Sequence, residues 1–204
     1  MNNRHPKAFF FSVALTGVFF CLIIFLFSLL NILSFNLKLS AYGPFVAGLP
    51  VAMLLPAFLA PALGLWTYLF LNNRFPNNNL EKFSLSVSNL ILGICAAMSF
   101  FGYLKWYTLI TFLILFILLL YIEYKNKLRF MYRFYRAYAV LLVPFYILCL
   151  AIKNASFLIL NGNAGLKLNL FSLPIEAYFS FMGILLTAVY LFEFFKNKIR
   201  HLNE

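Results

Sequence analysis

The sequence predicts an all-α, polytopic membrane protein: a transmembrane helical bundle of about six spans that forms a single integral-membrane domain over residues 1–204. Hydrophobic residues make up 64% of the chain and charged residues 10%, and the mean hydropathy is +0.92. Apolar runs long enough to cross a bilayer recur along the whole length, which is atypical of soluble domains. The lipid bilayer is therefore the expected surrounding of most of the chain.

Six apolar segments account for the predicted spans, and turn-forming or basic residues separate them. In the second span, Pro50, Pro56 and Pro61 predict either a kink or a helix that starts at Pro50, because neighbouring helices can satisfy the carbonyls that prolines free. The expected spans are 8–33, 44–71, 85–103, 106–122, 137–152 and 174–195.

The formal charge of +11 indicates topology rather than nucleic-acid binding, because the basic residues flank the apolar runs. Six spans place 12 of the 16 Lys and Arg residues on the side of the membrane that holds both termini. The positive-inside rule then predicts a multi-pass protein of the cytoplasmic membrane with both termini in the cytoplasm. The remaining four residues fall on the other side: Lys38, Lys105, Lys153 and Lys167.

The sixth span carries an acidic residue, Glu176, about one turn inside its first end. The chain has no Asp and only five acidic residues in all, so Glu176 is the leading candidate for carboxyl chemistry inside the membrane. Apolar surroundings favour the protonated form of a carboxyl group, whereas the first turn of a helix favours the carboxylate. A structural role stays open, in which Glu176 caps its helix or bonds a neighbouring Tyr.

Two segments of the chain are weakly similar to each other. GLPVAMLLPAF at 48–58 matches SLPIEAYFSF at 172–181, and each Leu-Pro pair opens a helix that runs in the same direction. We expect a weak parallel internal repeat with halves 8–84 and 106–198. Ala52 occupies the place of Glu176 in the first half.

Several motifs together resemble the small integral-membrane lycopene cyclase family, the heterodimeric or fused carotenoid cyclases of bacteria and fungi. They are LPIEAYFSF at 173–181, WYTLITF at 106–112 and RFYRAYAVLLVPF at 133–145. The likeness covers nearly all the chain in order and spacing. It departs from the family at the acidic pairs, where Val51 and Ala52 stand in the first half and Ala177 follows Glu176 in the second.

The resemblance implies cyclisation of an acyclic isoprenoid end group, with a polyene such as lycopene as substrate and with no cofactor, metal or net redox change. Protonation of the terminal alkene starts this reaction, and Glu176 is the expected acid. Aromatic rings can stabilise a carbocation and line a slot for a flat polyene. The expected substrate-binding residues are Pro174, Tyr178, Phe179, Phe181, Tyr107 and Arg136.

A second acid on the same span, Glu193, is too far from Glu176 to share its site, because 17 residues of helix extend about 25 Å. We expect Glu193 at the cytoplasmic end, in an ion pair near Lys196 and Lys198.

Other classes of function find little support in the sequence. There is no Asp-rich Mg²⁺ site and no nucleotide-binding glycine pattern, and His5 and His201 lie in the tails. Two alternatives remain: a non-catalytic relative that binds a carotenoid or a partner subunit, and a small transporter. The resemblance leaves open whether a homo- or hetero-oligomer forms.

Overall fold

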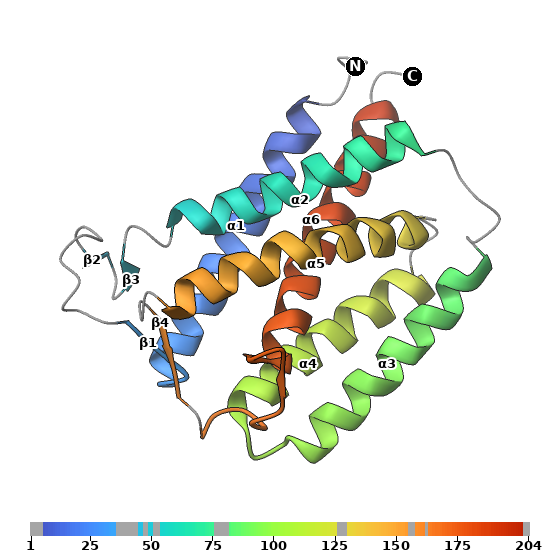
Figure 1. Cartoon of the computed structure of the whole chain (residues 1–204). Coiled ribbons are helices and arrows are strands. Elements are labelled where there is room, and N and C mark those ends of the chain that lie inside the picture. Colours follow the sequence, from blue (N-terminus) through green and yellow to red (C-terminus); the bar gives the residue numbers. More distant parts are fainter. Residues whose placement is uncertain are drawn as a thin grey trace.

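The computed structural model describes residues 6–35, 45–46, 49–50, 54–75, 82–125, 130–154, 158–161 and 163–201, and these form an all-α bundle, as the sequence predicts (Figure 1). A five-residue π-helical turn, η4 (Tyr121–Lys125), extends the fourth helix. The α-helices of the described residues are α1 (Pro6–Leu29), α2 (Leu54–Arg74), α3 (Ser84–Phe101), α4 (Trp106–Leu120), α5 (Met131–Asn154) and α6 (Ile175–His201).

Five of these helices are long and apolar enough to cross a membrane: α1, α3, α4 with its π-helical turn, α5 and α6. They show that the chain is a membrane protein. The 21 residues of α2 extend about 31 Å at 1.5 Å per residue, close to the thickness of the hydrocarbon core.

Helix α6 occupies the centre of the bundle and packs against α1, α2, α4 and α5 (Figure 1). Half of its most apolar window is buried inside the protein, a larger share than in the other four candidate spans. Its middle turn contributes Leu185, Leu186, Ala188 and Val189 to the core. Small residues let helices approach closely in a membrane. Gly64 allows α2 to approach α6 closely, because a Cβ at this position would overlap Cδ1 of Leu185.

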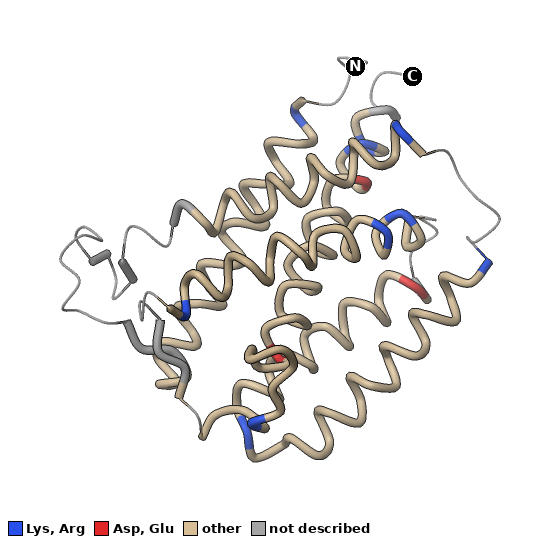
Figure 2. Tube along the Cα trace, in the orientation of Figure 1, with Lys and Arg blue, Asp and Glu red and all other residues tan. Residues whose placement is uncertain are grey.

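The helices alternate in direction, so their ends gather at two ends of the bundle (Figure 1). The start of α1 and the end of α6 lie together, beside the end of α2 and the start of α5. Figure 2 shows most of the basic residues that it colours at this end. The strands and the α3–α4 turn lie at the opposite end.

Three short antiparallel pairings join the connecting segments at that opposite end: β1 (Leu33–Phe35) with β4 (Leu158–Leu160), β2 (Phe45–Val46) with β3 (Leu49–Pro50), and β5 (Asn169–Leu170) with β6 (Leu173–Pro174). Each Leu-Pro pair thus forms the second strand of a small hairpin that leads into a helix. Strand β1 follows α1, and its partner β4 follows α5. The expected parallel repeat of 8–84 and 106–198 stays a prediction.

The largest correction concerns the second predicted span. We expected it to begin at residue 44, with a kink or a helix start at Pro50, but Pro50 lies in β3 and α2 begins at Leu54. Proline lacks an N–H group, and it is tolerated here at a strand edge before the helix. Pro61 lies inside α2. Val51 and Ala52, where the sequence lacks the acidic pair, fall outside the described residues.

Two other helices extend beyond the predicted span into polar sequence, and α1 ends earlier than predicted, before β1. Helix α5 begins six residues earlier than expected, at Met131, so part of the basic segment 123–136 is helical. Helix α6 extends past the predicted end at residue 195 to His201, while α1 ends at Leu29 rather than residue 33. Hydropathy identifies only the apolar part of a helix and misses turns that continue into the interface.

A partly buried polar cluster joins α3, α5 and the π-helical turn. The Ser88 hydroxyl donates to Glu123 Oε1 and shares a 2.7 Å hydrogen bond with the Tyr135 hydroxyl. Such interhelical bonds hold membrane helices in a fixed register.

Candidate active site

Glu176 lies in the first turn of α6, directly after the β5–β6 hairpin, and its side chain is fully buried. The segment that precedes the hairpin, residues 163–168, lies against the start of α4. A carboxyl group in this position is surrounded by α4 on one side and by residues 163–168 on the other.

The two carboxyl oxygens of Glu176 have different surroundings. The Thr108 hydroxyl on α4 donates a 2.6 Å hydrogen bond to Oε1, and the backbone N–H of Leu166 donates a 3.0 Å bond to the same oxygen. Oε2 is buried and has no hydrogen-bond partner among the described residues. An unsatisfied buried oxygen is costly and is often a functional atom. Glu176 therefore has one oxygen held by two donors and one buried oxygen without a hydrogen-bond partner among the described residues.

Residues 163–168 lie against the carboxyl group, and two hydrogen bonds join this segment to the start of α4 and the residue before it. The Tyr107 N–H donates to the Ala164 carbonyl at 3.1 Å, and Lys105 Nζ donates to the Asn163 carbonyl at 2.9 Å. Gly165 lies against the site, because a Cβ there would be 3.1 Å from Glu176 Oε1 and 3.6 Å from Tyr107 Cδ1.

Of the six predicted binding residues, Tyr107 and Phe179 lie on the same side of α6 as Glu176. Tyr107 is buried, packs edge-on against Phe27 at 5.4 Å between ring centroids, and its phenol interacts with Ser180. The ring of Phe179 lies 4.7 Å from that of Phe112 on α4.

Tyr178 and Phe181 face α5 instead. The rings of Phe181 and Phe145 stack at 4.3 Å, and Tyr178 packs edge-on against Phe145 at 6.0 Å. The Tyr178 hydroxyl donates to the Leu170 carbonyl at 3.1 Å, which anchors the β5–β6 hairpin. Pro174 lies in β6, two residues before Glu176. Tyr178, Phe179 and Phe181 thus follow Glu176 closely in the sequence, but they lie on two different faces of α6.

Comparison with known protein families gives a match to the family model described as lycopene cyclase, over residues 104–195. Residues 104–195, a little under half of the chain, are therefore similar to this family. The matched segment contains α4, α5 and most of α6, together with Glu176, Thr108 and all six predicted binding residues. Neither the comparison with curated proteins nor that with solved structures gives a match.

Arg136 lies at the opposite end of the bundle from Glu176. Its guanidinium group donates to the carbonyls of Leu71 at 3.0 Å and Phe75 at 3.3 Å, where it satisfies the last turn of α2. The structure does not bring Arg136 and Glu176 together.

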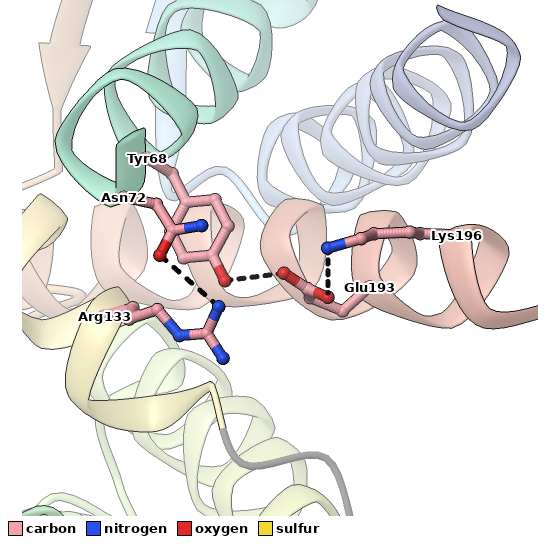
Figure 3. A network of polar contacts seen from close by, with 5 residues as sticks. All are labelled: Tyr68, Asn72, Arg133, Glu193 and Lys196. Carbon is pink, nitrogen blue, oxygen red and sulfur yellow. Dashed lines mark hydrogen bonds and ion pairs between the residues drawn. The ribbon is translucent and has the colours of Figure 1, made fainter. Parts of the chain in front are cut away.

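Glu193 forms the centre of a second polar network at this end of the bundle (Figure 3). Its Oε1 accepts a 2.7 Å hydrogen bond from the Tyr68 hydroxyl, and its Oε2 lies 3.5 Å from Lys196 Nζ. The expected ion pair with Lys196 is confirmed. The residue is buried, however, and Tyr68 and the neighbouring Arg133–Asn72 pair join the network, which the sequence did not predict.

The site contains three elements that sequence reasoning missed: Thr108, the Leu166 N–H and Gly165. Thr108 lies within the WYTLITF motif, but nothing in its spacing indicates a carboxyl partner 68 residues later. Gly165 ends the sequence NGNAG at 161–165, which is typical of a turn but does not indicate a contact with a carboxyl group. Among the described residues, no group of three or more His, Cys, Asp or Glu side chains is placed to hold a metal ion.

Proposed function

We propose that this protein is a carotenoid or isoprenoid end-group cyclase that converts the acyclic end of a polyene such as lycopene into a ring. The observation that carries the proposal is the buried Glu176 carboxyl, with one oxygen held by two donors and the other free of partners among the described residues, inside the segment that is similar to the lycopene cyclase family.

The proposed reaction begins with proton transfer from Glu176 Oε2 to the terminal trisubstituted alkene, which leaves a tertiary carbocation. A neighbouring double bond of the polyene attacks this cation, closes the ring and moves the positive charge into it. Loss of a proton from an adjacent ring carbon restores a double bond. The product is an isomer of the substrate, so no oxidant, reductant or metal takes part.

The donors at Oε1 support the first step. After the proton leaves, Glu176 is a carboxylate, and the Thr108 hydroxyl and Leu166 N–H stabilise that charge. The second proton transfer needs a base. The other carboxyl groups of the described residues belong to Glu123 and Glu193, and Glu193 is about 25 Å away along α6. We therefore assign both transfers to Glu176, which donates a proton and then recovers one.

The polyene would enter from the lipid, since a hydrocarbon of this kind partitions into the bilayer. Tyr107 and Phe179 are the rings on the Glu176 side of α6, where they would face the cationic end group. Pro174, Tyr178 and Phe181 shape the adjoining hairpin and the α5–α6 contact. With both termini in the cytoplasm, Glu176 would lie just inside the outer leaflet.

The proposal is tested by expressing the chain in cells that accumulate lycopene and separating the extracted pigments by chromatography. We expect a ring-bearing product with the wild-type chain, none with Glu176→Gln, and product with Glu193→Gln when conversion is normalised to the protein in the membrane. Unchanged lycopene with the wild-type chain would refute the proposal.

A second candidate is a non-catalytic relative that binds a carotenoid or a partner subunit. It is favoured by Ala177, which stands beside Glu176 where the resembling family carries a second acid. Purification in mild detergent distinguishes the two. A coloured, carotenoid-loaded protein that leaves added lycopene unchanged supports the binding function.

A further inference from the structure

We infer that Thr108 is a positioning residue for Glu176: its hydroxyl holds Oε1 as the acceptor oxygen of the carboxyl group and so keeps the transferable proton on Oε2. This inference rests on the proposed function for its catalytic consequence. The hydrogen-bond arrangement itself is tested separately.

The first step of the inference is the asymmetry of the two oxygens. Thr108 Oγ1 and the Leu166 N–H both point at Oε1, at 2.6 and 3.0 Å. In a neutral carboxyl group the carbonyl oxygen is the stronger acceptor, so two donors on Oε1 make it the carbonyl and leave the hydroxyl proton on Oε2. Oε2 is buried and no described residue accepts that proton, so the proton has no competing acceptor among the described residues.

The second step is the way in which Thr108 is held. It is fully buried in the first turn of α4, where β-branched side chains have few χ1 choices. A helical Thr often bonds a carbonyl of its own preceding turn, but Oγ1 here reaches across to α6. Its methyl group lies against the α3–α4 turn, since a Cβ on Gly102 would be 2.6 Å from Thr108 Cγ2. Packing of the methyl group therefore aims the hydroxyl at Glu176.

The third step is the effect on the reaction. Loss of a hydrogen bond to a charged group corresponds to about 10- to 100-fold in rate when the charge forms during the reaction. The Thr108 hydroxyl binds Glu176 rather than the polyene, so its loss should lower kcat and leave KM within about twofold.

The experiment compares Thr108→Val, which keeps the shape but removes the hydroxyl, with Thr108→Ser, which keeps the hydroxyl. Thr111→Val is the matched control, because Thr111 is a buried Thr one turn along α4 whose hydroxyl lies 3.3 Å from Ser180 Oγ. We expect kcat to fall about 10- to 100-fold in Thr108→Val, to recover to within about threefold in Thr108→Ser, and to stay near wild type in Thr111→Val. A fall confined to KM, or an equal fall in all three variants, would overturn the inference.

Infrared spectroscopy of the protein in lipid gives a readout that does not depend on turnover. A carboxylic C=O band that disappears in Glu176→Gln should move to higher frequency in Thr108→Val and return in Thr108→Ser, because the bond from Thr108 weakens the C=O bond. If this pattern appears in a protein that forms no ring product, the positioning role stands and the cyclase proposal falls. An unmoved band in Thr108→Val, or no band lost in Glu176→Gln, overturns the positioning role.

Discussion

The hydrogen bond from Tyr68 to Glu193 gives a prediction whose size can be derived from the structure. Tyr68 on α2 and Glu193 on α6 are 1% and 7% exposed, and their oxygens lie 2.7 Å apart (Figure 3). Tyr68→Phe removes the hydroxyl without changing the packing of the ring. Glu193 Oε1 then loses its donor while it remains buried beside Lys196.

The expected cost follows from the charge on the acceptor. A hydrogen bond to a charged group contributes about 1.5–3 kcal/mol, whereas a neutral one contributes about 0.5–1.5 kcal/mol. Tyr68→Phe should therefore lower the free energy of unfolding by about 1.5–3 kcal/mol. For a chain of this size, that corresponds to a fall of about 3–12 °C in Tm. In a Glu193→Gln background, the same substitution should cost only about 0.5–1.5 kcal/mol.

The assay is thermal unfolding of the detergent-solubilised protein, followed by the solubility of the folded fraction or by circular dichroism. Tyr103→Phe is the matched control, because Tyr103 is 64% exposed in the α3–α4 turn and its Tm should stay within about 1 °C of wild type. An unchanged Tm in Tyr68→Phe, or an equal fall in both backgrounds, would refute a charged bond between Tyr68 and Glu193.

Three further predictions concern the site and the helix contacts. Gly165→Ala should lower ring formation several-fold, because the added Cβ would push on Glu176 Oε1. Gly93→Ala is the control and should leave the rate unchanged, since its Cβ would meet nothing within 4 Å. Equal rates in the two variants would contradict the contact between Gly165 and Glu176. Arg136→Met should lower Tm, because two carbonyls at the end of α2 lose a charged donor; an unchanged Tm would show that this cap contributes nothing. Phe181→Ala should destabilise the protein by at least about 0.5–1.5 kcal/mol through loss of the ring stack alone, as measured by thermal unfolding.

The all-α membrane fold could be predicted from the sequence because the bilayer imposes a simple rule. Backbone groups in lipid must be satisfied within the segment, so long apolar runs become helices. The same rule explains the main error, at Pro50. Residues 44–53 are apolar enough to resemble the start of a span, but the pairing of β2 with β3 depends on contacts that hydropathy does not describe.

The candidate site was predictable only in part, because most of its contacts join residues that are far apart in the sequence. Glu176 could be found because an acid at membrane depth is costly, and this cost is visible in one position of the sequence. Its partners Thr108 and Leu166 lie on other elements and are ordinary residues in an apolar chain. Arg136 was grouped with the site through its motif, yet it lies with the Glu193 end of the bundle.

The turnover of Glu176→Gln tests the central claim most directly. Glutamine keeps the shape of the side chain and a carbonyl oxygen that can accept from Thr108, but it has no acidic proton to transfer. Conversion of lycopene per molecule of membrane-inserted protein should fall at least about 100-fold, which is the range for loss of a general acid. Ring formation at the wild-type rate in Glu176→Gln would show that another group protonates the polyene and would contradict the account.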